Sequence, residues 1–350
     1  MFKYKIVRAS APVWMRTLIP IVAILLSFVI TSIFVVIAGA NPLAAFYNFL
    51  IAPLSSQSSA LEVLVKSTPL ILTGIAVTFA FTAGYYNIGA EGQLYAGAIA
   101  AVWIGINFPQ LPSAVILPMM IVGGFLAGML WALIPALLKV YLKIDEVVTT
   151  LLMNSIIMYF VSFLLNDYWR NPQSGYPQSP NISDAAHFAR LIPKSRLHAG
   201  FIMALLVVVI VYFLIKRTPL GLRMRASGAN AAGARFAGIN VSRTMLTAAL
   251  VSGGIAGLAG MGEIAGIHFH LIEALSSSYG YTGIIAATLG GLHPLGVALA
   301  AIFIGLIGTG SQTVSFALGV PVYLGDIVQS TLLLVTLAML LLQNYRIERR

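Results

Sequence analysis

Long runs of apolar residues recur along the chain, and short polar segments separate them. A helix that crosses a bilayer needs about 20 predominantly apolar residues, because the hydrocarbon core is about 30 Å thick. Runs of this kind predict an all-α, polytopic membrane protein that forms a single domain over residues 1–350. The predicted spans are Thr17–Ala38, Leu61–Thr82, Tyr85–Ile106, Ser113–Leu138, Val147–Leu165, His198–Ile215, Thr244–Gly266 and Asp326–Leu342, with Tyr281–Gly310 as one span or two.

Two places interrupt this helical pattern. Ala83–Gly84 leaves almost no loop between two apolar runs, which predicts a short or broken helix near residues 83–93, either re-entrant or a full span. Gly290–Pro294 divides Tyr281–Gly310, which is then one long tilted helix or two short helices hinged at 290–294. Non-helical backbone at membrane depth occurs only where protein or a water-filled cavity covers it.

The distribution of Lys and Arg decides how often the chain crosses. With the N-terminus in the cytoplasm, Lys139, Lys143, the loop 216–243 and the basic C-terminus are all cytoplasmic only if Tyr281–Gly310 crosses twice. Cytoplasmic loops carry an excess of Lys and Arg, so we expect about ten transmembrane helices with both termini cytoplasmic. The same asymmetry explains the net charge of +10 without a nucleic-acid partner. The remaining cations then lie outside, namely Lys66, Arg170, Arg190, Lys194 and Arg196.

The first apolar run shares features with a signal peptide, since basic residues precede it and Ala38-Gly39-Ala40 imitates a cleavage site. The apolar core of a signal peptide is about 7–15 residues long, and Thr17–Ala38 exceeds this. We therefore expect the run to be retained as the first helix.

Two loops are long enough to have structure of their own. The extracytoplasmic loop 166–197 is rich in proline and aromatic residues, which fits either an ordered cap or a solvated connector. The cytoplasmic loop 216–243 contains a helical core, Asn230–Gly238, made mostly of alanine and glycine. A helix lying on the membrane surface would need larger apolar residues than these.

Composition and missing motifs exclude several classes of function. Hydrophobic residues make up 59% of the chain and charged residues 9%, whereas soluble domains carry about 25% charged residues. The sequence has no P-loop, no His-Glu-x-x-His and no Gly-x-Ser-x-Gly. It has no cysteine, and His268 and His270 make a poor metal pair. We therefore expect no catalytic residue, no metal site and no cofactor bound by this chain.

Polar residues gather where two predicted spans begin, in Gly84–Gln93 and Glu146–Asn154. A charged side chain near mid-bilayer costs about 2.5–3.5 kcal/mol on insertion scales. Glu91 is therefore expected either to face a pathway or to cap the exposed N–H groups of a broken helix. Thr150 and Asn154 are four residues apart and share one helix face, where they either join helices or line a pathway.

Three segments together resemble the permease family of bacterial ABC importers for ribose-like sugars and nucleosides. They are Gly84–Gln93, with its string Asn-Ile-Gly-Ala-Glu-Gly-Gln, Glu146–Asn154, and the cytoplasmic Gly228–Ile239. The resemblance covers roughly Leu61–Leu342, and the first segment points to the nucleoside branch. It implies a permease subunit of the bacterial inner membrane that forms half of the translocation pathway for a nucleoside, with a ribose-like sugar as the alternative.

The resemblance also implies partners, because such a permease carries no ATPase. Cytoplasmic ABC ATPase subunits would use the ATP, and an extracytoplasmic substrate-binding protein would deliver the substrate. A second permease subunit would complete the pathway, as a heterodimer in preference to a homodimer. An ion-coupled secondary transporter, with Glu91 or Glu263 as the proton carrier, is the rival interpretation, and it needs no docking helix.

Two sets of residues follow from this resemblance. The expected substrate pathway consists of Asn87, Glu91, Gln93, Tyr86, Thr150 and Asn154, although Asn87 also suits a helix N-cap. The expected ATPase-coupling residues are Asn230, Arg235, Phe236 and Gly238, on a short helix whose small-residue face fits a groove and whose Arg235 pairs with a carboxylate. The predicted spans contain no Lys or Arg except Lys66, which favours a neutral substrate over a phosphate ester.

Overall fold

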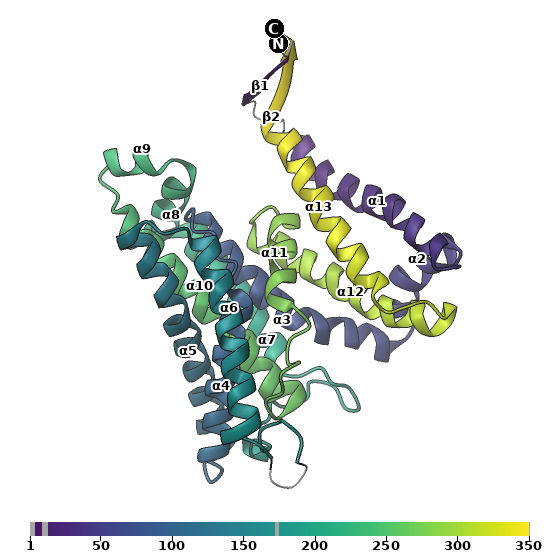
Figure 1. Ribbon diagram of the computed structural model, residues 1–350, viewed down its shortest axis with the longest axis vertical. Coiled ribbons are helices and arrows are strands. Elements are labelled where there is room, and N and C mark those ends of the chain that lie inside the picture. Colours follow the sequence, from purple (N-terminus) through teal and green to yellow (C-terminus); the bar gives the residue numbers. More distant parts are fainter. Residues whose placement is uncertain (1–3, 9–12, 172–174, 350) are drawn as a thin grey trace.

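The computed structural model describes residues 4–8, 13–171 and 175–349, and this part of the chain is helical apart from two short strands (Figure 1). Long apolar runs form the long helices, and the polar segments form the turns between them. The elements are β1 (Tyr4–Arg8), α1 (Val13–Ile37), α2 (Pro42–Leu50), α3 (Gln57–Thr82), α4 (Ala90–Asn107), α5 (Ser113–Leu142), α6 (Glu146–Phe163), α7 (Gly200–Arg217), α8 (Pro219–Ala229), α9 (Ala231–Phe236), α10 (Val241–Glu263), α11 (Tyr279–Leu289), α12 (Pro294–Leu318), α13 (Leu324–Asn344) and β2 (Tyr345–Arg349). Short π-helical turns extend α6 and α10, and single 3₁₀ turns follow α2 and precede α7.

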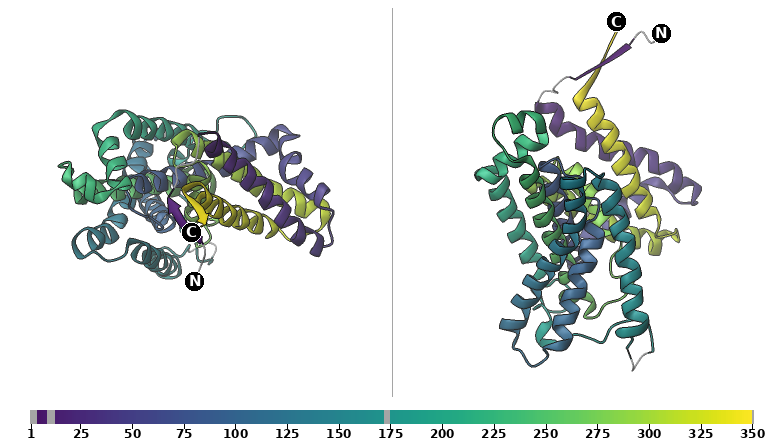
Figure 2. Two further views of the ribbon diagram at one scale, coloured as in Figure 1. Left: turned by 90° about the horizontal axis from the view of Figure 1, so that it is seen from above. Right: turned by 60° about the vertical axis from the view of Figure 1, so that its left-hand side comes forward.

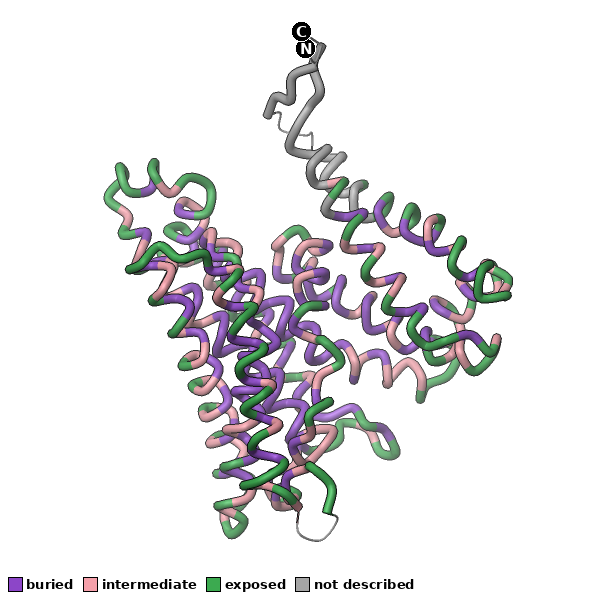
Figure 3. The backbone as a smooth tube through the Cα atoms, in the orientation of Figure 1, coloured by how far each residue is buried: buried purple, intermediate pink, exposed green. Residues whose placement is uncertain are grey.

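The helices form two groups that lie side by side (Figures 1 and 2). The larger group contains α3 to α11, and the smaller one contains α1, α2, α12 and α13, with α12 packed on α3 between them. Within the larger group α3 is central, since 89% of its most apolar stretch is buried against 28% for α5. Buried positions accordingly concentrate on the inner helices (Figure 3), and the outer faces of α5, α6 and α7 expose large apolar side chains.

Glycine allows α10 to pack closely against both α4 and α5. A Cβ atom at Gly97 of α4 would clash with the backbone of Gly257, and one at Gly128 of α5 would clash with the backbone of Gly253. Small residues let membrane helices approach at backbone distance. The abundance of glycine in the sequence therefore has a direct structural use here.

Among the described residues, six helices are long and apolar enough to cross a membrane, and α1 with α2 gives a seventh if that pair, bent by 119°, is one span. This shows a polytopic helical membrane protein with fewer candidate spans than the ten we predicted from charge. The other predicted spans are helical, but each is too short or too polar to count as a candidate span among the described residues. The first turns of α4 carry Glu91 and Gln93, α11 has only 11 residues, and α13 contributes a shorter apolar helix, Leu324–Thr336, among the residues whose side chains are described.

Both predicted interruptions are confirmed. Residues 83–89 are not helical and separate α3 from α4, while a turn over residues 290–293 separates α11 from α12, so the stretch 281–310 forms two helices. Gly84 and Gly291 have φ values of +76° and +63°, in the left-handed region that glycine adopts without strain. A Cβ at Gly84 would also lie 3.2 Å from the Cα of Gly228. The break therefore contacts the loop that carries α9.

The two ends of the chain pair with each other, which the hydrophobic pattern did not predict. β1 and β2 form an antiparallel two-stranded sheet in which Tyr4 lies opposite Arg349 and Arg8 opposite Tyr345. Both ends therefore lie at the end of the molecule where α9 projects (Figure 1).

The described part of the loop that we predicted to be extracytoplasmic, residues 166–171 and 175–197, forms an ordered cap. The backbone N–H of Ile182 donates to the carbonyl of Phe269 at 2.8 Å, and that of Phe188 donates to the carbonyl of Ala265 at 2.8 Å. These bonds join the loop to the segment that follows α10, which confirms the ordered-cap interpretation over a solvated connector.

Two side-chain contacts attach this cap to the helices. Arg196 forms an ion pair with Glu62 near the start of α3. The ring of His198 stacks on Phe188 with an interplanar angle of 9°, and its Nδ1 accepts the N–H of Gly200 at 3.1 Å. His198 therefore acts as a packing group.

Candidate functional site

A cluster of amide side chains closes the helix break between α3 and α4. Asn87 and Gln93 pair their carboxamides, with Asn87 Nδ2 donating to Gln93 Oε1 at 2.8 Å and Gln93 Nε2 donating to Asn87 Oδ1 at 3.0 Å. Asn87 also donates to Ser252 Oγ of α10 at 2.9 Å and accepts the N–H of Gly89. Ser252 in turn donates to the carbonyl of Ala76 in α3 at 2.6 Å. Both amides are buried, and Asn87 uses all of its donors and acceptors, so the cluster fixes three helices against one another.

The predicted N-cap role of Asn87 is wrong in detail. The residue that precedes α4 is Gly89, and no side chain caps it. Asn87 lies two residues earlier and bonds the Gly89 N–H at 2.9 Å, as an Asx-turn. The turn was recognisable from the residue type, but its position depends on the pairing with Gln93.

Asn154 joins α6 to α4 and α11. Its Oδ1 accepts the N–H of Gly92 at 2.8 Å, and its Nδ2 donates to the carbonyl of Ile88 at 3.1 Å and to the hydroxyl of Tyr281 at 2.9 Å. Thr150, one turn earlier, donates only to its own helix, to the Glu146 carbonyl at 2.6 Å, and packs against Gly89. Of the two interpretations for these residues, the structure shows the helix-joining one directly for Asn154.

Glu91 caps a helix that lies 189 positions further along the chain. Its Oε2 accepts the N–H of Gly280 at 2.6 Å, in the first turn of α11. A carboxylate at a helix N-terminus is stabilised by the free N–H groups and the helix dipole. The capping interpretation therefore holds, although for α11 and not for a helix next to Glu91 in sequence.

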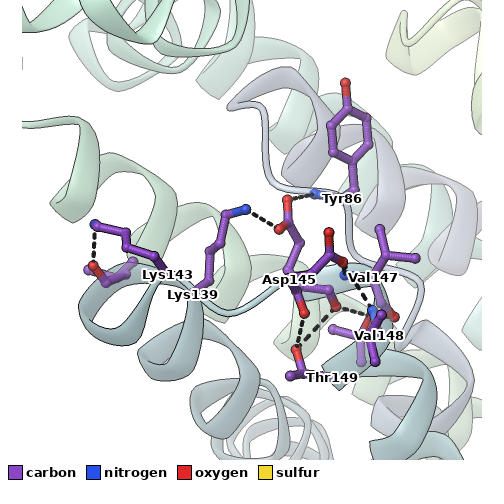
Figure 4. Close-up of polar contacts among 10 residues, drawn as sticks. Tyr86, Lys139, Lys143, Asp145, Val147, Val148 and Thr149 are labelled. Carbon is purple, nitrogen blue, oxygen red and sulfur yellow. Dashed lines mark hydrogen bonds and ion pairs between the residues drawn. The ribbon is translucent and has the colours of Figure 1, made fainter.

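Tyr86 lies apart from this cluster, on the side of the break that faces the α5–α6 turn. Its backbone N–H donates to Glu146 Oε1 at 3.3 Å, and Glu146 forms an ion pair with Lys139 (Figure 4). The side chain of Tyr86 is half-exposed and packs edge-to-face on Phe81 at 5.1 Å. Asn87, Glu91, Gln93, Thr150 and Asn154 are thus brought together, and Tyr86 is not.

A cavity of about 470 Å³ opens beside this cluster, between α4, α6 and α11. We call it the α4–α11 cavity. Two of the predicted residues, Glu91 and Asn154, line it. Tyr95 lines it as well, and its hydroxyl donates to the carbonyl of Glu273 at 2.7 Å and accepts the N–H of Ser276 at 3.1 Å. The other lining residues are Ser155, Met158, Glu273, Ala274, Ser276, Ser278 and Tyr281.

Sequence reasoning missed the segment that forms one side of this cavity. Residues 269–278 follow α10 and run without helix to the start of α11. The available signal was the run Ser276–Ser278 between two apolar stretches, because serines at membrane depth need protein or water around them. Ser252 carried no such signal, since a single serine in an apolar helix is ordinary.

The α9 segment presents the second predicted set of residues. Asn230 caps α9, and its Oδ1 accepts the N–H groups of Ala232 and Gly233 at 3.0 Å each. Ala234 is buried against the rest of the chain, whereas Arg235 is exposed and Phe236 is 97% exposed. Gly238 ends the segment with φ +80° and has open space around it. The projecting feature is therefore a bare aromatic ring beside the small residues that we expected to form the contact.

Within the described part of the chain, no three His, Cys, Asp or Glu side chains are grouped so that they could hold a metal ion. His270 lies in the segment after α10, where burial lowers its pKa. His293 precedes α12 without a side-chain cap bond to it, and its ring contacts Tyr212 at 5.7 Å.

Known proteins resemble this chain over nearly its whole length. A family model described as "Branched-chain amino acid transport system / permease component" matches residues 59–337, which include the helix break, the α4–α11 cavity and α9. The chain is 33% identical to the glucose ABC transporter permease protein of Haloferax volcanii, over 97% of this chain and 92% of that protein. It is 33% identical to the guanosine ABC transporter permease protein of Bacillus subtilis, over 91% and 92%, respectively. It is 30% identical to a nucleoside ABC transporter permease protein of Lactococcus lactis subsp. cremoris, over 85% and 84%.

Proposed function

The chain belongs to the branched-chain amino acid transport system / permease component family, and from this premise we propose that it forms half of the translocation pathway for a nucleoside. It is a multi-pass protein of the plasma membrane and a non-catalytic subunit that binds no cofactor itself. ATPase subunits and a substrate-binding protein are its partners. This premise replaces the ion-coupled transporter that the sequence left open.

The observation that carries the nucleoside proposal is the lining of the α4–α11 cavity. It contains two carboxylates, Glu91 and Glu273, a carboxamide, serine hydroxyls and two tyrosines, with neither Lys nor Arg. Anionic phosphate groups favour cationic side chains, so this lining disfavours nucleotides and sugar phosphates. A neutral nucleoside has hydroxyl and amino groups for the carboxylates, and an aromatic face stacks a base for about 1–3 kcal/mol.

Relatives with nucleoside and guanosine in their names support this substrate class, while the glucose permease of Haloferax volcanii supports a sugar. The two substrates share hydroxyl groups and differ in the base. Tyr281 favours the nucleoside, since this aromatic residue lines the cavity and is 39% exposed. A simple sugar is therefore the second candidate.

Among the residues assigned to the pathway, we propose two roles. Glu91 and Asn154 form part of the pathway wall, because both line the cavity while their polar atoms bond Gly280 and Gly92 within the chain. Asn87, Gln93 and Thr150 hold the helix break in place, since their polar atoms are buried and bonded within the protein. Tyr86 lines the cytoplasmic exit, beyond the break.

The ATPase contact is proposed at α9, through Asn230, Arg235, Phe236 and Gly238. A side chain as large and apolar as Phe236 gains nothing from an exposure of 97% on the cytoplasmic side. Aromatic and arginine side chains together are the usual anchors of protein interfaces. The cap Asn230 keeps this short helix formed before the partner binds.

The assembly is proposed to contain a second, related permease in place of a second copy, and the cap 166–197 is proposed to face the substrate-binding protein. In support of this arrangement, the cap lies at one end of the molecule, and the two termini and α9 lie at the other (Figure 1). With both termini in the cytoplasm, this arrangement keeps most Lys and Arg inside.

Uptake by the assembled transporter tests the substrate. Labelled uridine, adenosine, ribose and glucose should be compared in cells that carry the permeases, ATPase and binding protein. We expect ATP-dependent nucleoside uptake that Glu273→Gln lowers. Uptake of ribose or glucose without any nucleoside would overturn the substrate and leave the permease function in place.

A further inference from the structure

A second polar cavity, of about 260 Å³, lies between α3, α11, α12 and α13. We call it the α12–α13 cavity. Ser276 and Ser278 border the α4–α11 cavity, while Ser277 and Tyr279 border this one. One short stretch of chain therefore separates the two cavities. None of the six pathway residues expected from the sequence lines the second one.

The absence of a side chain at Gly308 leaves room in this cavity. A Cβ at Gly308 would lie 3.9 Å from both Lys66 Cδ and Gln329 Nε2, whereas Gly305, one turn earlier on α12, lets α12 pack closely on Ser67 of α3. The polar ends of Lys66 and Gln329 thus reach the cavity over a glycine surface. The cavity is consequently open between helices that are otherwise tightly packed.

Several polar side chains around this cavity have no partner within the described residues. Asp326, Gln312 and Gln329 line it and make no hydrogen bond or ion pair there. Lys66 Nζ makes one bond, to the carbonyl of Gly308 at 3.0 Å. Ionisable and amide side chains in membrane helices are costly unless they face a water-filled cavity or a ligand, and they mark transport pathways. The saturated amides of the helix break show the opposite condition.

Resting on the nucleoside import proposed above, we propose that the α12–α13 cavity binds the adjacent hydroxyl groups of the substrate's sugar ring. A carboxylate such as Asp326 accepts hydrogen bonds from two neighbouring hydroxyls, and carboxamides both donate and accept. Lys66 and Asp326 carry opposite charges, so the cavity favours a ligand without net charge. The ring hydroxyls of a nucleoside and those of a free monosaccharide share this chemistry.

Cysteine labelling tests the site directly, because the chain contains no cysteine of its own. Gln312→Cys in the assembled transporter should react with an impermeant maleimide from the outside. We expect uridine to slow this reaction at least fivefold and dideoxyuridine, which lacks both ring hydroxyls, to leave the rate unchanged. Ala317→Cys, on the same helix but outside the cavity lining, is the matched control and should react at one rate with every ligand.

Uptake provides the second readout. Asp326→Asn and Gln329→Ala should lower the preference for uridine over dideoxyuridine about tenfold, while Gln110→Ala, an exposed carboxamide in the α4–α5 turn, keeps it. Equal protection by uridine and dideoxyuridine in a transporter that imports uridine would overturn the hydroxyl site and leave the proposed function standing. Protection by ribose or glucose alone, with uptake of that sugar alone, would support the site and overturn the nucleoside assignment.

Discussion

The helix break and α9 are both made of the small and polar residues that the sequence marks, and the structure uses them in opposite ways. At the break, the side-chain amides of Asn87 and Asn154 form hydrogen bonds to other parts of the same chain. At α9, Phe236 is 97% exposed and Gly238 has open space around it. A buried polar group without a partner costs about 1–3 kcal/mol, so the bonds at the break stabilise the fold of this chain, whereas the exposed ring of Phe236 makes no such contribution.

In this transport subunit, the residues of the break therefore determine the shape of the chain, and the residues of α9 form an exposed surface. The break lies against α8, the helix that precedes α9, since Gly84 packs on Gly228. If an ATPase binds α9 as proposed, its movement would reach the backbone next to the α4–α11 cavity through α8.

We expect the largest effect, on the free energy of unfolding, from a substitution at the helix break, where the polar side chains are hydrogen-bonded within the chain. Asn154→Leu removes three hydrogen bonds, to Gly92, Ile88 and Tyr281, and at about 1 kcal/mol each this lowers the free energy of unfolding by about 3 kcal/mol. Thermal unfolding of the purified permease in detergent measures it. Asn107→Leu is the control, because Asn107 is exposed and bonds only its own helix. Equal losses in the two variants would contradict the joining role of Asn154.

A substitution on the exposed surface of α9 should lower the affinity for the ATPase and leave the stability of the fold unchanged. Phe236→Ala should weaken ATPase binding about 30-fold, which corresponds to the roughly 2 kcal/mol of an interface hot spot, and leave thermal unfolding unchanged. Phe316→Ala provides the matched control, since Phe316 is 91% exposed on α12, away from α9. Copurified ATPase, titrated against permease, gives the affinity. Loss of binding in both variants, or in neither, would remove α9 as the contact.

A smaller effect should separate the two roles of Glu91. Glu91→Gln keeps an oxygen for the Gly280 N–H, so it should cost about 1 kcal/mol of stability, and Glu91→Ala about twice that. Uptake by Glu91→Gln at saturating substrate should stay within about twofold of the natural protein. If Gln abolishes uptake while stability is kept, the charge of Glu91 acts on the substrate itself and capping is secondary.

The sequence predicted the parts of this molecule that depend on neighbours along the chain. Apolar runs located the helices, and the dipeptides at 83–84 and 290–291 located both breaks. It could not predict that Glu91 bonds Gly280 or that Asn154 bonds Tyr281, because 189 and 127 positions separate these pairs. Their partners are a backbone N–H and a tyrosine hydroxyl, and nothing in the sequence around these two groups indicates that they form the bonds.

The same limit applies to the second cavity and to the chain ends. Asp326 and Lys66 come from α13 and α3 and line one cavity only after the two groups of helices pack. The strands β1 and β2 lie at opposite ends of the chain and pair with each other, so no local sequence pattern predicts them. For α9, the cap Asn230 was recognisable, but the exposure of Phe236 depends on how far the segment projects.

Accessibility of a single cysteine at position 236 tests the central claim, that α9 is the surface through which an ATPase drives this permease. Phe236→Cys in inverted membrane vesicles should react quickly with an impermeant maleimide when the permease is alone, and at least tenfold more slowly after the ATPase binds. Asp184→Cys, on the opposite cap, should not react in these vesicles with or without the ATPase. A rate at position 236 that the bound ATPase leaves unchanged would contradict the account.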